Sequence, residues 1–281
     1  MSDDAALTHT VRGYKPDRDM PLLEGMAKSA GWAPHDRPFE QILPAVRSKM
    51  VTLSDHHWIP EFTPISDQGR AGSCVANGWC DAVEMLLGLK YGDAGVVQLS
   101  RRFAYWISRY LHSETDWDNG TYLRSMAHQF RKVGVIPESM MPYSDRHELI
   151  VGKTASPKLE HYTAASNNRI KGFYRLSSQG DQLLSEMELA IRSNHPVIIA
   201  VEVGRPFLQV RGLELCDVPK TSIGSHCMVV VGFRRDGDRR DWIVRNSWGT
   251  YWGDRGHCLL TDAYMKTSSD TWVGTLLEPL V

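Results

Sequence analysis

The order of apolar patterns along the chain limits most strongly what the sequence can fold into. Before about residue 165, apolar residues recur with the 3.6-residue period of a helix, in residues 73–87, 99–111 and 122–133. After it, short runs rich in β-branched residues predict strands at residues 197–203, 227–233, 242–244 and 258–261. Helices followed by strands predict an α+β chain with two segregated lobes. The cleft between two such lobes is a common place for an active site.

Charge and hydropathy exclude several classes of function. The 281 residues carry 32 Lys and Arg against 33 Asp and Glu, so neither a nucleic acid nor an anionic membrane is expected as a partner. The first ten residues lack the basic and apolar regions of a signal peptide. The longest apolar run, residues 196–201, is far too short to span a membrane and predicts a buried strand.

The sequence contains five cysteines, at positions 74, 80, 216, 227 and 258, with no Cys-x-x-Cys pair. This odd, scattered set argues against a zinc site and against a dense disulfide framework. We therefore expect no metal and no cofactor, and we expect the reducing cytoplasm as the compartment. Free cysteines usually pack as small buried hydrophobes, so a catalytic role for any of them requires support from its neighbours.

Cys74 has such neighbours. The small-residue turn Ala71-Gly72-Ser73 delivers it to the first turn of a predicted amphipathic helix. The unpaired N–H groups and the dipole of a helix start favour a thiolate, so we expect Cys74 to be a nucleophile and the most reactive of the five thiols. Gln68 lies six residues upstream and can offer its side-chain N–H groups to an oxyanion, beside the backbone N–H of Cys74.

Two residues from the strand-rich half suit the roles of a proton carrier and of a residue that orients it. His226 stands at the start of the predicted buried strand 227–233, and Asn246 follows the strand 242–244. The histidine would act as general base and acid. The asparagine carbonyl would accept the second N–H of the ring and fix its tautomer, and Trp248 would shield that hydrogen bond from water.

These motifs resemble those of the papain-like cysteine peptidases, in the order in which that family has them. Gln-Gly-x-x-Gly-Ser-Cys occupies residues 68–74, Ser-His-x-Met-Val-Val-Val-Gly-Phe residues 225–233, and Asn-Ser-Trp-Gly-Thr-x-Trp-Gly residues 246–253. Gly13-Tyr-Lys-Pro-Asp also resembles an opening found in prokaryotic members. The resemblance covers about residues 51–281. It implies a two-lobed fold, in which a cleft separates a helical lobe from an antiparallel, β-barrel-like lobe.

The resemblance also assigns roles to residues. It implies a triad of Cys74, His226 and Asn246, with Gln68 and the Cys74 N–H as the oxyanion hole. The candidate substrate-binding residues are Asn119, Gly120, Ser225 and Trp248, and the backbone of Gly120 would contact an extended peptide. Two positions depart from the family pattern. Ala71 replaces a cysteine that usually forms a disulfide, and Val75 replaces an aromatic residue beside the nucleophile.

The predicted reaction is hydrolysis of a peptide or protein substrate through a thioester. Two alternatives remain open at this stage. The same triad could pass the acyl group to an amine or thiol, as in an acyl transferase or amide synthase, or the fold could serve as a catalytically silent peptide-binding protein.

Three parts are predicted along the chain: an N-terminal extension (residues 1–50), a helical lobe with the nucleophile (residues 51–165) and a β lobe with His226 and Asn246 (residues 166–281). In the extension, apolar residues at helical spacing predict a helix that packs on the body, namely Phe39, Ile42, Leu43, Val46 and Met50. Papain-like enzymes are commonly made with an inhibitory pro-segment. We therefore expect the extension to be either such an inhibitor, as in a zymogen, or a structural staple.

Overall fold

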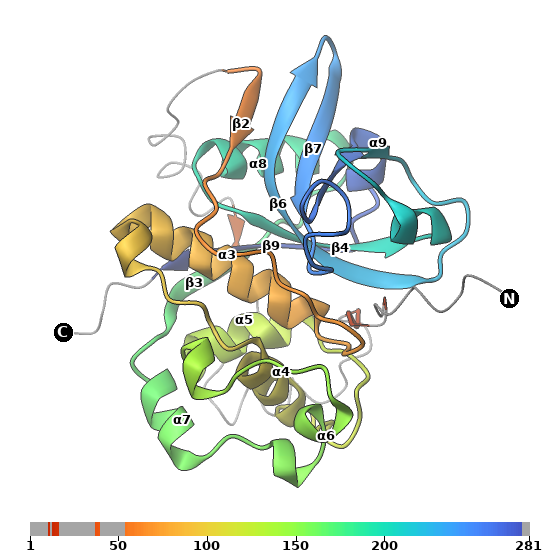
Figure 1. The fold of residues 1–281 in the computed structure, drawn as a ribbon. Helices are drawn as coiled ribbons and strands as arrows, with labels where there is room; N and C mark the ends of the chain where they lie inside the picture. The colour runs from red at the N-terminus through yellow and green to blue at the C-terminus, as the bar shows by residue number, and fades with distance from the viewer. Residues whose placement is uncertain (1–10, 12, 17–36, 40–53, 277–281) are drawn as a thin grey trace, which may run out of the picture.

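The computed structural model describes residues 11, 13–16, 37–39 and 54–276. Its helical lobe contains the long helix α3 (Cys74–Tyr91), the helices α4 (Arg101–Tyr110) and α5 (Leu123–Lys132), and the short α6 (His147–Ile150) and α7 (Leu159–Ala165). Single 3₁₀ turns connect them: η4 (Asp93–Gly95), η5 (Glu138–Met140) and η6 (Lys153–Ala155). Figure 1 shows α3 lying between the other helices and the sheet.

Local chemistry explains where these helices begin and end. The Ser100 side chain accepts a hydrogen bond from the Phe103 N–H at 3.1 Å and so caps α4. After α5 the chain reverses at Gly134, which has φ +95° and passes so close to residue 165 that a Cβ atom would lie 1.9 Å from the Ala165 carbonyl oxygen. The Asn77-Gly78 pair, an ordinary turn signal, lies inside α3. Gly78 lets the helix approach the sheet, because a Cβ atom there would stand 3.0 Å from Cys227 Sγ.

The second lobe is a nine-stranded mixed sheet in the order β1-β3-β9-β4-β6-β7-β8-β5, with β2 paired to β6. Its strands are β1 (Arg37–Pro38), β2 (His56–Trp58), β3 (Ile170–Arg175), β4 (Val197–Val203), β5 (Leu215–Cys216), β6 (Gly224–Asp236), β7 (Arg239–Arg245), β8 (His257–Thr261) and β9 (Asp270–Leu276). Among the strands of the described residues, the pairs β1–β3 and β5–β8 are parallel and the others antiparallel. Over the described residues the sheet is open, so the expected barrel-like lobe does not close into a barrel.

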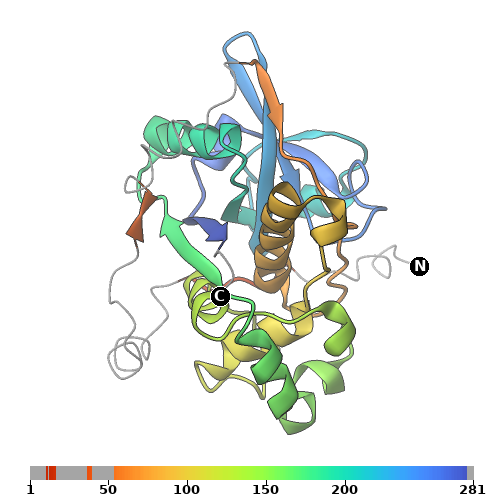
Figure 2. The ribbon, with the colours of Figure 1, turned by 90° about the vertical axis from the view of Figure 1, so that its left-hand side faces the viewer.

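Three further elements complete this lobe: the helices α8 (Gly180–Arg192) and α9 (Asp262–Met265) and the 3₁₀ turn η7 (Arg205–Gln209). Figure 2 shows α3 and α8 on opposite sides of the central strands. The predicted segregation of helices and strands is confirmed. A turn at Asp236-Gly237 joins β6 and β7, with Gly237 at φ +63°. The predicted domain boundaries stay a prediction. Strand β2, which lies within residues 51–165, pairs with β6 of the sheet.

A buried ionic cluster ties the lobes together. The Asp81 carboxylate of α3 forms ion pairs with Arg101 Nη2 of α4 at 2.5 Å and with Arg245 Nε of β7 at 3.2 Å. Arg245 also pairs with Glu61, whose other carboxylate oxygen contacts His257 Nε2 at 2.8 Å. Burial opposes ionisation of Glu61, but the hydrogen bonds and charges of His257 and Arg245 outweigh it and lower the pKa of that carboxyl to about 2. The cluster fixes Arg245, the residue before Asn246.

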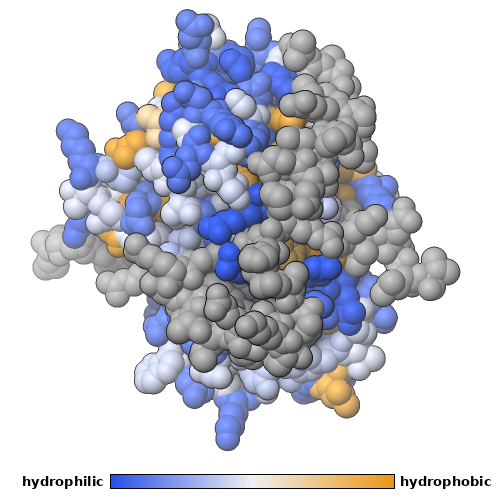
Figure 3. Space-filling model, turned by 180° about the vertical axis from the view of Figure 1, so that it is seen from behind, coloured by the Kyte–Doolittle hydropathy of each residue, from blue (hydrophilic) through white to orange (hydrophobic). Residues whose placement is uncertain are grey.

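One face of the molecule shows how its surface is composed. On the face seen in Figure 3, hydrophilic residues predominate, and apolar residues occur singly or in small groups. Among the described helices, none combines the length and apolar character needed to cross a membrane. Of the apolar stripe predicted in the extension, Phe39 is buried, while Ile42, Leu43, Val46 and Met50 lie outside the described residues.

Candidate active site

Cys74 opens helix α3 and is completely buried. The loop before it is held in several places. Gln68 donates its side-chain N–H to the Ala71 carbonyl at 3.0 Å and accepts a hydrogen bond from Ser247 Oγ at 2.7 Å. The Tyr143 hydroxyl lies 2.6 Å from Ser73 Oγ and donates to the Gln68 carbonyl at 2.9 Å. These contacts fix both Gln68 and the start of the helix relative to the loop that follows Asn246.

His226 and Asn246 meet in the sheet lobe, where β6 begins and β7 ends. The distance from His226 Nε2 to Asn246 Oδ1 is 2.7 Å, and the Ser247 N–H donates to the same oxygen at 2.8 Å. Since an N–H donor fixes which amide atom is the oxygen, Asn246 Oδ1 must accept from His226, and Nε2 carries the proton. Nδ1 is therefore the nitrogen that can exchange a proton with a thiol. The Trp248 ring packs on the imidazole at 4.6 Å between centroids.

The Cys74 thiol reaches the strand that carries His226. The backbone N–H groups of Cys227, Val75 and Cys74 itself favour the thiolate, but burial has the larger effect and raises the pKa of this thiol to about 12. The charge of Asp118 acts in the same direction as burial. The structure thus places the Cys74 thiol beside Cys227, the residue that follows His226. The raised pKa means that this thiol is protonated near pH 7.

Residues 11 and 13–16, the covering segment, contribute to the burial of Cys74 through Gly13. A Cβ atom on Gly13 would stand 2.3 Å from Cys74 Sγ, and a Cβ atom on Gly224 would stand 2.8 Å from Val11 Cγ2. Tyr14 forms a parallel bridge with Thr121: the Thr121 N–H donates to the Gly13 carbonyl at 3.0 Å, and the Lys15 N–H donates to the Thr121 carbonyl at 2.9 Å. In Figure 1 this segment appears as short red pieces at the N-terminal end of α3.

The candidate substrate-binding residues lie around this segment with different partners. The Gly120 N–H donates to the Tyr105 hydroxyl at 3.0 Å, so the backbone pairing with the segment is made by its neighbour Thr121. Gly120 itself adopts φ +81°, and a Cβ atom there would stand 2.5 Å from the Gly13 carbonyl oxygen. Asn119 is exposed. Ser225 donates its hydroxyl to Glu202 at the start of β6, beside His226.

Sequence reasoning missed Asp118, which connects the nucleophile loop to the Thr121 loop. Its carboxylate accepts the Gly72 N–H at 3.0 and 3.2 Å and the Tyr105 hydroxyl at 2.6 Å. Through the Tyr105 hydroxyl it is linked to the Gly120 N–H. The sequence signal was the position of Asp118 directly before Asn119-Gly120, but an acidic residue in a loop is usually solvated.

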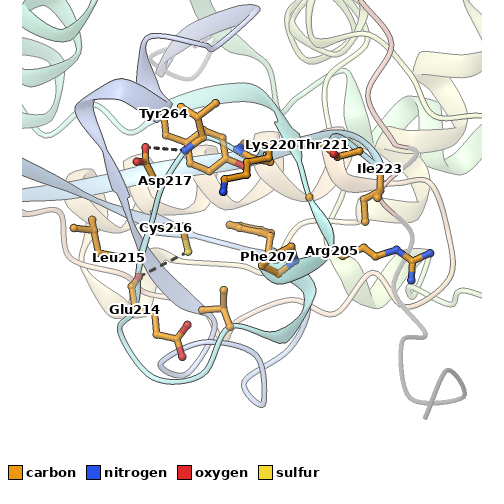
Figure 4. A pocket seen from close by; sticks show the side chains of 15 residues that line it. Arg205, Phe207, Glu214, Leu215, Cys216, Asp217, Lys220, Thr221, Ile223 and Tyr264 are labelled. Atoms are coloured by element: carbon orange, nitrogen blue, oxygen red, sulfur yellow. Dashed lines mark hydrogen bonds between the residues drawn. The ribbon is translucent and has the colours of Figure 1, made fainter. Parts of the chain in front are cut away.

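Burial and pKa argue against the expected order of thiol reactivity for the chain with the covering segment in place. Cys74 is buried with a raised pKa, whereas Cys216 is half-exposed and a hydrogen bond with Cys258 lowers its pKa. Cys216 lines a separate cavity of about 630 Å³ in the β lobe (Figure 4). This cavity is formed by the loop between β4 and β6 together with Tyr264 of α9, and no triad residue lines it.

Within the described part of the chain, no three His, Cys, Asp or Glu side chains gather in a way that could hold a metal ion. The site brings together a buried thiol, an imidazole and an amide. A cysteine at a helix start beside a histidine that an amide orients is the arrangement of a cysteine protease.

Residues 54–270, more than half of the chain, match the papain family of cysteine proteases, and the chain belongs to this family. An uncharacterized peptidase C1-like protein of Acanthamoeba polyphaga mimivirus is 27% identical over 80% of this chain and 72% of its own length. For a cathepsin L-like proteinase of Fasciola hepatica the identity is 24%, over 84% of this chain and 66% of that protein. Cathepsin K of Gallus gallus is 26% identical, and the match spans 57% of its length.

Solved structures confirm the papain-like fold. Xylellain, a cysteine protease from Xylella fastidiosa, superposes with a TM-score of 0.76 at 21% identity, over 96% of this chain and 97% of that one. Bromelain from Ananas comosus, in complex with the E64 inhibitor, superposes with a TM-score of 0.61 at 20% identity, over 80% of this chain and 100% of that one.

Proposed function

We propose that this chain hydrolyses peptide bonds through a Cys74 thioester, with His226 as proton carrier and Asn246 as its orienting partner. The observation that carries the proposal is the 2.7 Å contact between His226 Nε2 and Asn246 Oδ1, made beside a cysteine at a helix start. Because Nε2 carries the ring proton in that contact, Nδ1 carries the lone pair that can accept the proton of the Cys74 thiol.

The reaction then proceeds in two balanced steps. His226 takes the proton of Cys74, and the thiolate attacks the scissile carbonyl carbon, whose oxygen becomes an oxyanion stabilised by the Gln68 side chain and the Cys74 N–H. The C–N bond breaks as the imidazolium gives its proton to the departing amine. Water then attacks the thioester with His226 as base, which releases the acid and restores the thiol.

The covering segment makes the chain latent in this proposal. The Gly13 backbone occupies the space in front of Sγ, and its carbonyl oxygen accepts a hydrogen bond from the Thr121 N–H. The segment thus lies across the thiol and is anchored to the Thr121 backbone. This favours the inhibitory reading of the extension over the staple, at least for residues 11 and 13–16.

The test is product analysis on the full-length Gly13→Leu variant, because any side chain at position 13 collides with Cys74 Sγ and displaces the segment. We expect acid-quenched samples to contain Cys74 acylated by the N-terminal part of a model peptide, and the products to be free acid and amine. Addition of an amine nucleophile separates the alternatives: conversion of most acyl groups to amides indicates a transferase. Peptide binding without any acylation of Cys74 would contradict the proposal and indicate a silent binding protein.

A further inference from the structure

Lys15 occupies a small acidic and aromatic site at the edge of the active site. Its Nζ lies 2.6 Å from Glu114 Oε2 and 5.5 Å from the centre of the Tyr122 ring. The side chains of Lys15 and Glu114 are only 20% and 30% exposed. A carboxylate at salt-bridge distance and an aromatic face within 6 Å are the two features that recognise an alkylammonium group.

The site is built by the body of the protein rather than by its occupant. Glu114 follows helix α4, where its backbone N–H donates to the Arg109 carbonyl at 3.0 Å. Tyr122 is buried and is backed by the His112 ring at 4.9 Å between centroids. His112 Nε2 in turn lies 2.6 Å from Ser125 Oγ of α5. The carboxylate and the ring are therefore held in place by contacts that do not involve Lys15.

The local charge remains negative when Lys15 is removed. Residues 111–120 contain Glu114, Asp116 and Asp118 and no lysine or arginine. Burial lowers the pKa of His112, which keeps that ring neutral near pH 7. The nearby Arg109 guanidinium is directed at backbone carbonyls, those of Trp117 at 2.6 Å and Ile150 at 2.5 Å.

The position of the site along the Thr121 backbone gives it a role for substrates. Gly13 faces Cys74, Tyr14 lies opposite Thr121, and the Lys15 N–H pairs with the Thr121 carbonyl. An extended chain advances about 3.3 Å per residue, so a peptide that replaced the segment would place a side chain at this site about two residues from the thiol.

We propose that Glu114 and Tyr122 form a subsite that selects peptides with lysine or arginine at the position now taken by Lys15. This proposal rests on the proposed function for its catalytic meaning. In the covering segment, Lys15 occupies this subsite in the way that a basic residue of the substrate would. The proposed substrates are therefore peptides with a lysine or arginine at this position.

Binding to a full-length chain in which the site is vacated tests the subsite separately from turnover. The Gly13→Leu/Lys15→Gln/Cys74→Ser variant, which keeps an atom at the γ position of residue 74 for the new side chain at position 13 to collide with, is titrated with labelled, otherwise neutral ten-residue peptides that carry one lysine at successive positions, and with the same peptides carrying methionine. At one position, we expect the lysine peptide to bind about five- to tenfold more tightly, the scale of one partly exposed ion pair with a cation–π contact.

Variants of the subsite and a matched control show whether Glu114 causes the preference for the lysine peptide. Glu114→Gln should bring that ratio to about one, and Glu114→Lys should reverse it, whereas Glu148→Gln, at an exposed position on α6, should leave it unchanged. No preference at any position, or a preference that survives Glu114→Gln or is lost in Glu148→Gln, would overturn the subsite. If the chain with Cys74 intact cleaves no bound peptide, the proposed peptidase fails and the subsite stands. If it cleaves peptides without preference for a basic residue, the proposed peptidase stands and the subsite fails.

Discussion

Gly13 lies directly against the thiol of Cys74: a Cβ atom on residue 13 would stand 2.3 Å from Sγ. A residue near the N-terminus thus determines the exposure of a cysteine that begins a helix 61 positions later in the chain. Glycine is required at this position by contact, because the backbone fills the space in which a side chain would have to fit. The proposed nucleophile is therefore covered, although its proposed partners His226 and Asn246 are already in contact.

Thiol labelling should report this covering. In the wild-type chain we expect iodoacetamide to modify Cys216 first, because it is half-exposed with a lowered pKa, while Cys74 is buried with its pKa raised to about 12. In Gly13→Leu, Cys74 should become reactive and Cys216 should be unchanged. Peptide mapping after brief labelling measures both. Rapid labelling of Cys74 in the wild-type chain would contradict the assignment.

The two partners of the thiol should differ in their effects. In the Gly13→Leu background, His226→Ala should lower kcat/KM by about 10³-fold or more, since the histidine moves the proton. Asn246→Ala removes one hydrogen bond to the ring and should cost about 10- to 100-fold, corresponding to about 1–3 kcal/mol. Steady-state kinetics with one fluorogenic peptide compares them, with circular dichroism as the folding control. Equal and complete loss in both variants would mean that the roles are wrongly assigned.

Asp118 should support both the stability and the geometry of the site. Asp118→Ala leaves the buried Gly72 N–H and the Tyr105 hydroxyl without their acceptor. We expect a loss of about 1–3 kcal/mol in the free energy of unfolding, the usual cost of such groups. Urea denaturation measures it. Asp116→Ala, at an exposed position in the same loop, is the matched control and should change stability little. An equal loss of unfolding free energy in both variants would contradict the role of Asp118 in supporting the site.

The Glu61 carboxyl should make stability depend on acid. Its pKa is lowered from 4.5 to about 2 in the folded chain, so its contribution is present above pH 4.5 and is lost as the pH falls toward 2. The full contribution corresponds to about 3 kcal/mol. Thermal unfolding of the wild type and Glu61→Gln between pH 7 and pH 3 checks this. The wild type should be more stable at pH 7, and the difference should shrink below pH 4.5. A difference independent of pH would contradict the assignment.

Much of the fold, and the residues that meet at the candidate site, could be predicted from local patterns. The apolar period gave α3, α4 and α5 to within a few residues, and the β-branched runs gave β4, β6, β7 and β8. Helix α8 has the same period in Leu183, Leu184, Met187, Ala190 and Ile191, and so could also be predicted. Strands β3 and β9 carry little signal, because Gly172 and Gly274 interrupt them and their partners lie about 100 residues apart.

The missed features of the site share a cause. The contact of Gly13 with Cys74 and the hydrogen bond from Gly72 to Asp118 join segments that are distant in sequence. Gly13 belongs to a recognisable motif, but neither contact could be located from the sequence, because each depends on where a backbone group faces after the chain has folded. The helix start predicts a lowered pKa for Cys74, whereas burial, to which the remote residue Gly13 contributes, raises the pKa of this thiol.

The central claim is that Cys74 is a peptidase nucleophile covered by the segment around Gly13. The most direct measurement is kcat/KM for hydrolysis of one fluorogenic peptide by four full-length chains: wild type, Gly13→Leu, Cys74→Ala and the double variant. We expect Gly13→Leu to exceed the wild type by about tenfold or more, which corresponds to about 1.4 kcal/mol or more of displaced contacts, and both Cys74→Ala chains to be inactive. Equal rates for wild type and Gly13→Leu, or hydrolysis by a chain without Cys74, would contradict the account.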